Sequence, residues 1–75
     1  MNIEQTVFGI NPDVILSLRV FVTRDDALFE TVTNATIYVN PRQQYSAILY
    51  DDKHNTVAIL TYVPGPWNGW EKDGI

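Results

Sequence analysis

The sequence has no cysteine, which excludes disulfide bonds and metal sites built from thiolates. It has one histidine, His54, so a single subunit cannot form a site with several histidine ligands. It also lacks a glycine-rich phosphate loop, a dinucleotide-binding fingerprint, a nucleophile elbow and a metalloprotease motif. These absences predict a protein that is not an enzyme and that carries no cofactor or metal.

Long apolar runs are missing as well. Ser17, Arg19 and Thr61 interrupt the most hydrophobic stretches well short of the ~20 residues that span a bilayer. The first residues lack the basic start and the apolar centre of a signal peptide. We therefore expect a cytoplasmic protein without a membrane partner.

Basic residues are few. Five Lys and Arg residues stand against nine Asp and Glu residues, which gives a formal net charge of −4. General binding to nucleic acid or to anionic membranes requires a concentrated basic face. The charge balance argues against those ligands and is compatible with a basic protein partner.

The 75 residues suffice for one domain with a single small core. A chain of this length buries only roughly 60% of its unfolded surface, so a partner or a second copy would add stabilising area. We expect one domain over residues 1–75. Residues 1–12 form either a short extended segment or an N-terminal arm, and residues 64–75 form a tail that Pro and Gly keep out of regular structure.

The clearest local signal is a β-hairpin over residues 45–63, in which two apolar, β-rich runs flank a polar cluster at residues 51–55. The cluster contains two carboxylates and the histidine, but its spacing matches no calcium or zinc pattern, and its composition is that of a tight turn. We expect Asn55 to adopt the left-handed backbone conformation that a three-residue loop needs.

The expected hairpin register pairs Asp52 with Thr56 and puts Tyr50 opposite Ala58. In this register Tyr50 and Tyr62 share one face of the sheet. Both faces of the hairpin are then largely apolar, so we expect it to lie centrally with another layer covering at least one side.

Three further elements are expected. Residues 14–22 are β-branched and alternate, which predicts a strand, although residues 11–13 also resemble a helix start. Residues 23–33 predict a short helix with Thr23 as its N-cap, with a strand as the alternative. Residues 36–39 predict a strand that a turn joins to the hairpin.

The predicted fold class is therefore α+β: a small antiparallel four-stranded sheet in β-α-β-β-β order, with one short helix packed on one face. If residues 23–33 form a strand, the alternative is an all-β meander or small barrel. The second sheet face would stay open, be covered by the N-terminal arm or meet a partner.

Aromatic side chains are the candidate binding residues. A Trp supplies a large apolar area and one hydrogen-bond donor, so it either folds back to cap a small core or anchors an interface. Of the two tryptophans we expect Trp70, which precedes charged residues, to be the exposed one. The predicted partner-binding residues are Trp67, Trp70, Tyr50, Tyr62, Phe21 and Arg19.

These observations predict a small non-enzymatic protein-binding module that inhibits or regulates a larger protein by occupying its surface, through strand addition or a Trp anchor. In size and acidic charge the chain is similar to inhibitors that phages and mobile elements use against host enzymes. Two alternatives stay open. One is a nucleic-acid-linked role, by base stacking on the sheet or by acidic mimicry, and the other is a homodimer or assembly subunit.

Overall fold

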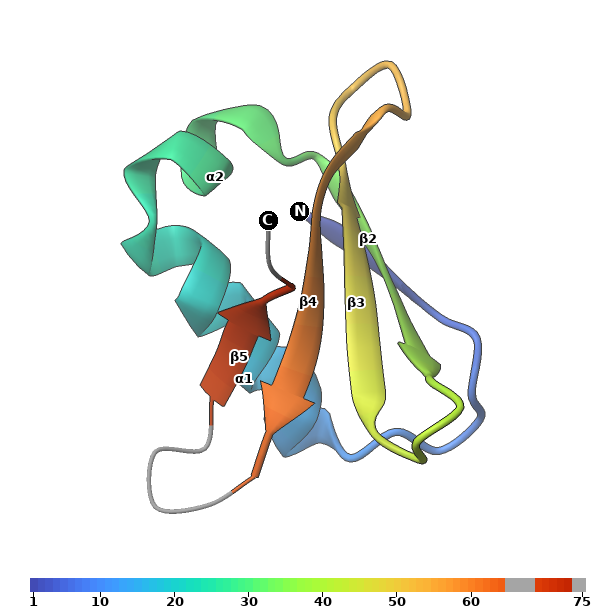
Figure 1. Cartoon of the computed structure of the whole chain (residues 1–75). Coiled ribbons are helices and arrows are strands. Elements are labelled where there is room, and N and C mark those ends of the chain that lie inside the picture. The colour runs from blue at the N-terminus through green and yellow to red at the C-terminus, as the bar shows by residue number, and fades with distance from the viewer. Residues whose placement is uncertain (65–68, 74–75) are drawn as a thin grey trace.

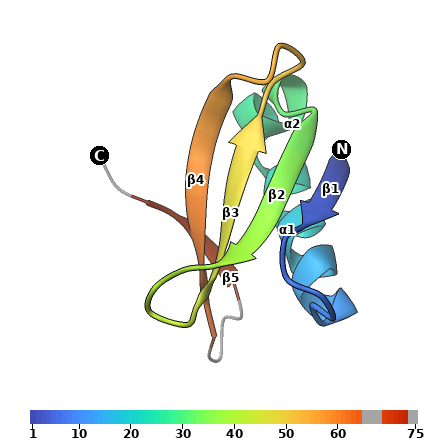
Figure 2. The ribbon, with the colours of Figure 1, turned by 90° about the vertical axis from the view of Figure 1, so that its right-hand side faces the viewer.

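The structure is a computed structural model that describes residues 1–64 and 69–73 (Figures 1 and 2). These residues form one mixed sheet of five strands in the order β1-β2-β3-β4-β5, with β1 parallel to β2 and the other neighbours antiparallel. Two helices cover one face of this sheet (Figure 1). Along the chain the elements are β1 (Asn2–Gln5), α1 (Pro12–Arg24), α2 (Asp26–Thr31), β2 (Asn34–Val39), β3 (Tyr45–Tyr50), β4 (Thr56–Val63) and β5 (Gly69–Lys72).

The α+β class is confirmed, and its details are corrected. The prediction of four antiparallel strands with one helix differs from the mixed five-stranded sheet with two helices. The difference arises because α1 occupies the segment expected as the first strand, while β1 and β5 each add a strand at one edge of the sheet.

Helix α1 shows that the strand predicted over residues 14–22 is wrong. The Asn11 side chain caps the helix by accepting a hydrogen bond from the Asp13 backbone N–H at 2.9 Å, and Pro12 is the first helical residue. Burial of every fourth residue against the sheet outweighs the weak helix propensity of the β-branched residues. The buried positions of α1 are Val14, Leu18 and Val22.

Helix α2 confirms a helix inside residues 23–33, but with another start. Asp25, not Thr23, is the N-cap, and its carboxylate accepts a hydrogen bond from the Leu28 backbone N–H at 3.2 Å. The Thr23 hydroxyl donates to the Arg19 carbonyl oxygen at 2.7 Å because it lies within the last turn of α1. Leu28 anchors α2 to the core at 5% exposure.

The β3–β4 turn is held by one carboxylate. Asp51 Oδ1 accepts hydrogen bonds from the Asn55 backbone N–H at 2.8 Å and from the Lys53 backbone N–H at 2.9 Å. The left-handed residue is His54, with φ of 66°, and the expectation for Asn55 is therefore wrong. The Asn55 hydrogen bond is the largest cause that lowers the pKa of Asp51, since it favours the ionised carboxylate.

The hairpin register differs by one residue from the expected one. Leu49 lies opposite Ala58 and Tyr50 lies opposite Thr56, with a β-bulge between these two pairs. A slip of one residue moves side chains to the other face. Tyr50 therefore lies on the face opposite to that of Leu49, whereas Tyr62 lies on the covered face beside Trp70, so Tyr50 and Tyr62 do not share a face.

The core lies between the helices and the covered face of the sheet. The largest side chains that lose all contact with water come from α1 and from the three central strands. They are Leu18, Ile37, Leu49 and Leu60. Within residues 1–64 and 69–73, no buried side-chain nitrogen or oxygen lacks a hydrogen-bond partner.

Both ends of the described chain add edge strands. Residues 2–5 form the parallel strand β1, so this part of the N-terminal segment is extended and pairs with β2. The tail was expected to lack regular structure, but β5 pairs with β4 through Tyr62 opposite Trp70, so this expectation is wrong. Trp67 lies outside the described residues.

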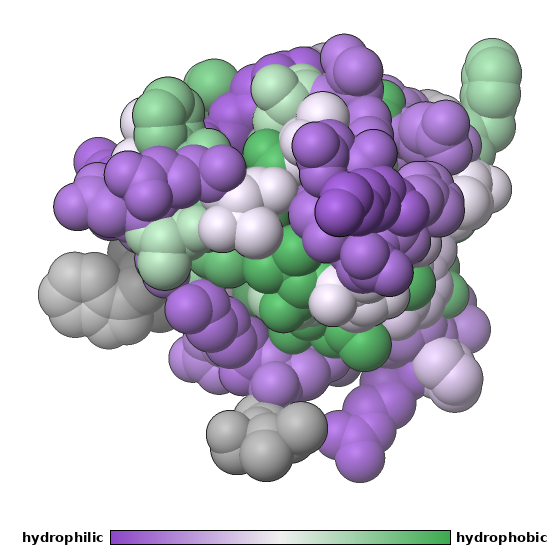
Figure 3. Space-filling model, turned by 90° about the horizontal axis from the view of Figure 1, so that it is seen from above, coloured by the Kyte–Doolittle hydropathy of each residue, from purple (hydrophilic) through white to green (hydrophobic). Residues whose placement is uncertain are grey.

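Figure 3 looks down on the end of the molecule that carries α2 and the β3–β4 turn, where hydrophilic side chains surround an apolar area near the middle. The chain folds tightly, with a radius of gyration of 11.5 Å over its Cα atoms. In the part of the chain that the structure describes, no helix has the length and apolar character needed to cross a membrane.

Candidate functional site

Within residues 1–64 and 69–73, one face of the sheet carries no helix, and Figure 2 views the molecule from that side. We call it the uncovered face. Because Ala47 and Leu49 point into the core, the alternation of a strand directs Ile48 to the uncovered face. Register then places Ile48 between Thr36 on β2 and Ile59 on β4. Ile48 is half-buried and Ile59 is 41% exposed, so together they form an apolar centre.

Polar groups next to this centre are held by hydrogen bonds. Ser46 is 2% exposed, and its hydroxyl accepts a hydrogen bond from Asn40 Nδ2 at 3.0 Å. On β4 the Thr61 hydroxyl donates to Asp73 Oδ1 at 2.6 Å. These bonds fix the side chains around the two isoleucines before any partner arrives.

Carboxylates lie at both edges of the uncovered face. Glu4 on β1 lies opposite Thr36, and Glu71 on β5 lies opposite Thr61. Side chains directly opposite each other on neighbouring strands lie on the same face of a sheet, so both glutamates belong to the uncovered face. Asp73 is held next to Thr61 by the hydrogen bond described above. The apolar centre therefore has an acidic rim.

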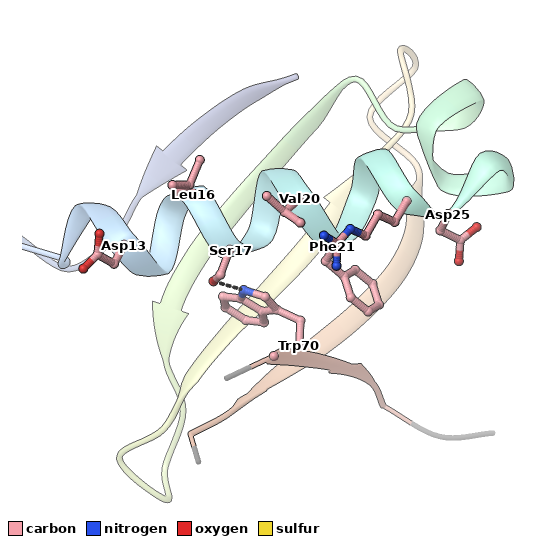
Figure 4. A pocket seen from close by; sticks show the side chains of 9 residues that line it. Asp13, Leu16, Ser17, Val20, Phe21, Asp25 and Trp70 are labelled. Carbon is pink, nitrogen blue, oxygen red and sulfur yellow. Dashed lines mark hydrogen bonds between the residues drawn. The ribbon is translucent and has the colours of Figure 1, made fainter. Parts of the chain in front are cut away.

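A second surface feature is a groove of about 480 Å³ between α1 and β5 (Figure 4). At its floor the Trp70 indole N–H donates to the Ser17 hydroxyl oxygen at 2.9 Å. The Ser17 hydroxyl in turn donates to the Val14 carbonyl oxygen at 2.6 Å. Phe21 lines the groove beside Trp70.

The outer wall of the groove is an exposed apolar ridge on α1. Leu16 is 59% exposed and Val20 is 38% exposed. At the end of α1, Lys72 Nζ forms a salt bridge with Asp25 Oδ2 at 3.0 Å. The hydrogen bond from Lys72 is the largest cause that lowers the pKa of Asp25, followed by the bond from the Leu28 backbone N–H.

The structure brings only some of the predicted binding residues together. Phe21 and Trp70 line the same groove, and the Tyr62 ring meets the Trp70 ring edge-on with centroids 5.3 Å apart. The expectation that Trp70 is exposed is wrong: it is 4% exposed because α1 and Tyr62 enclose it.

Two other predicted residues, Tyr50 and Arg19, lie elsewhere. Tyr50 is separate from the groove and stacks on His54 with ring centroids 4.4 Å apart. Arg19 is exposed and donates from Nη1 to the Met1 carbonyl oxygen at 3.1 Å. Whether any of these residues contacts a partner stays a prediction.

Sequence reasoning missed the two isoleucines of the uncovered face and the α1 ridge. Ile48 and Ile59 were missed because the register expected for the hairpin differs by one residue from the observed register. Leu16 and Val20 were missed as a helical pair because the alternating β-branched pattern of residues 14–22 predicts a strand. The helix start at residues 11–13 was the signal that could have found this ridge.

In the described residues, no three His, Cys, Asp or Glu side chains come close enough together to hold a metal ion. That the chain is not an enzyme stays a prediction. No family model matches the chain, and neither the search of curated proteins nor the search of solved structures finds a match.

Proposed function

We propose that this protein is a small non-enzymatic binding module that inhibits or regulates a larger cytoplasmic protein by occupying its surface through the uncovered face. The observation that carries the proposal is the pair Ile48 and Ile59, which no other layer of the described residues covers and which lies at the centre of a polar, acidic surround. An apolar centre inside a polar rim is the usual anatomy of a protein–protein interface.

The energetics favour the centre of this face as the anchor. Full burial of an isoleucine side chain contributes about 1.5–3 kcal/mol, and Ile59 at 41% exposure still has part of that area to bury. The sheet already holds Ile48 and Ile59 side by side, so binding orders few additional side chains.

The charge of the rim indicates which kind of partner surface would be complementary. Glu4, Glu71 and Asp73 border the uncovered face, and the chain as a whole has a formal net charge of −4. A partner surface with an apolar patch inside a ring of Lys and Arg would complement both the centre and the rim, with the charges acting mainly on the rate and specificity of association.

The experiment is quantitative affinity capture from cells of the native source with immobilised wild-type protein, Ile59→Arg and a control, Phe29→Arg. Phe29 is 62% exposed on α2, on the other side of the sheet, so the control adds the same charge away from the uncovered face. Circular dichroism melts verify that both variants fold. We expect Ile59→Arg to reduce recovery of the partner about tenfold or more, while Phe29→Arg retains it. Equal recovery with Ile59→Arg would remove the uncovered face as the binding surface.

A salt titration of the captured complex separates this proposal from acidic mimicry of nucleic acid. If the Ile48–Ile59 centre supplies most of the affinity, affinity falls only modestly between low and moderate salt, because salt screens the rim charges and not the apolar contact. Affinity that collapses over this range would favour the charge-driven alternative, in which the carboxylates replace phosphates.

A further inference from the structure

The exposed side of α1 carries four residues in a single stripe: Asp13, Leu16, Val20 and Arg24. Their spacing of three, four and four residues keeps them on one side of the helix. Leu16 and Val20 occupy the middle of the stripe, an acid lies near its start, and a base lies at its end. The stripe therefore has an apolar centre and opposite charges at its two ends.

A hollow lies directly beside this ridge. The groove of about 480 Å³ runs between the stripe and β5, with Ser17, Phe21 and Trp70 among its lining residues (Figure 4). Ridge and groove thus lie next to each other on one surface, which is the arrangement that a two-fold axis can make self-complementary.

We infer that a second copy of this chain docks on this surface, with the two α1 helices antiparallel. A two-fold axis that passes between the two helices at the level of Leu18 would place Leu16 beside Val20 of the second copy. The same axis would place Asp13 beside Arg24 of the second copy. Each apolar contact and each ion pair then occurs twice, because the interface is isologous. The ridge of either copy enters the groove of the other.

The free edge of β5 borders the same surface. The Asp73 backbone N–H donates to the Ile59 carbonyl oxygen. Because the hydrogen-bonding direction alternates along a strand, the backbone groups of Gly69 and Glu71 also point toward β4. The backbone groups of Trp70 and Lys72 then point toward the free edge. Within the described residues β5 is the last strand of the sheet, so no other strand pairs with this edge. A second copy on α1 would shield this edge, which is otherwise open to unspecific strand pairing.

The size of the molecule is compatible with such a dimer. A standard interface removes about 800 Å² from each partner, and the surface of the described chain is 5267 Å². The helix α1, with 13 residues, is about 20 Å long and can supply a contact of this extent together with the groove. The uncovered face lies on the other side of the sheet from α1, so a dimer formed through α1 would leave it available.

Charge-swap variants test the inference. Asp13→Lys makes both ends of the stripe positive and Arg24→Asp makes both ends negative, so each variant alone would place like charges in contact at both ends of the dimer. A mixture of the two variants would restore both ion pairs. The matched control is Arg42→Asp, an exposed residue in the β2–β3 turn.

Sedimentation equilibrium over a concentration series measures the outcome. We expect the wild type and Arg42→Asp to dimerise with the same dissociation constant, each α1 variant alone to dimerise about tenfold more weakly or worse, and the equimolar mixture to recover the wild-type constant. A wild type that stays monomeric at millimolar concentration would overturn the inference, as would a mixture that fails to recover. Loss of dimer in Ile59→Arg but not in the α1 variants would assign the contact to the uncovered face instead.

Discussion

Replacement of Trp70 by alanine tests the finding that this side chain is part of the core. Trp70 is 4% exposed, donates to the Ser17 hydroxyl oxygen at 2.9 Å and meets the Tyr62 ring edge-on. Truncation of a buried Trp to Ala costs about 3–5 kcal/mol. Domains have about 0.05–0.15 kcal/mol of stability per residue, or roughly 4–11 kcal/mol for a chain of this length. We therefore expect Trp70→Ala to remove about a quarter of the stability or more.

The assay is thermal unfolding followed by circular dichroism. In a domain of this size about 1 kcal/mol corresponds to 4–8 °C in Tm, so Trp70→Ala should lower Tm by roughly 12 °C or more. The control Phe29→Ala alters an apolar side chain that is 62% exposed and should change stability by no more than about 0.5 kcal/mol. A fall of less than about 4 °C for Trp70→Ala would refute the reasoning and return Trp70 to the candidate interface anchors.

A double-mutant cycle isolates the hydrogen bond from the packing. Trp70→Phe keeps most of the ring area and removes the indole N–H, while Ser17→Ala removes the acceptor. The two substitutions should couple by about 1 kcal/mol, because a buried donor without a partner costs more than a pair removed together. A coupling of zero would mean that the bond does not stabilise the α1–β5 contact.

Three further predictions concern acid stability and the backbone conformation at two turn residues. Contacts with Lys72 hold the pKa of Asp25 below its ordinary value, so their stabilising effect is present above the ordinary carboxyl pKa and is lost as pH falls through the lowered one. Asp25→Asn, which keeps an oxygen for the helix cap, should therefore flatten the loss of stability below about pH 4 in melts against pH, and an unchanged slope would contradict this. At Gln43, with φ of 63°, Gln43→Gly should raise the free energy of unfolding by about 0.5–1 kcal/mol. At Gly9, with φ of 82°, Gly9→Ala should lower it by about 1 kcal/mol, although no atom lies within 4 Å of the added Cβ. Urea titrations check both, and effects of the opposite sign would exclude backbone strain at these positions.

The elements that were predictable from the sequence are those with local signals. The β3–β4 hairpin and the turn at its tip follow from two β-rich runs around a cluster of turn residues. Local chemistry did not determine which residue of the turn is left-handed. The Asp51 carboxylate closes the loop one residue earlier in the chain than the sequence predicts. The pairing of β3 with β4 is therefore shifted by one residue, and this shift changes which side chains lie on the uncovered face.

Elements that depend on tertiary contacts were not predictable. The β-branched residues of α1 favour a strand, and the helix forms because Val14, Leu18 and Val22 together face the sheet. Strand β5 has four residues, too few for a periodic signal, and its place depends on pairing with β4 and on the bond from Trp70 to Ser17.

The most direct test of the proposed function is a map of the partner's contact on this chain. Isotope-labelled protein, with assigned amide and isoleucine methyl signals, is titrated with the captured partner and followed by NMR. The uncovered face predicts that the largest shifts occur at Ile48 and Ile59, with Leu16 and Val20 on α1 nearly unchanged. Shifts confined to α1, with the isoleucine signals unmoved, would contradict the assignment of the partner to the uncovered face.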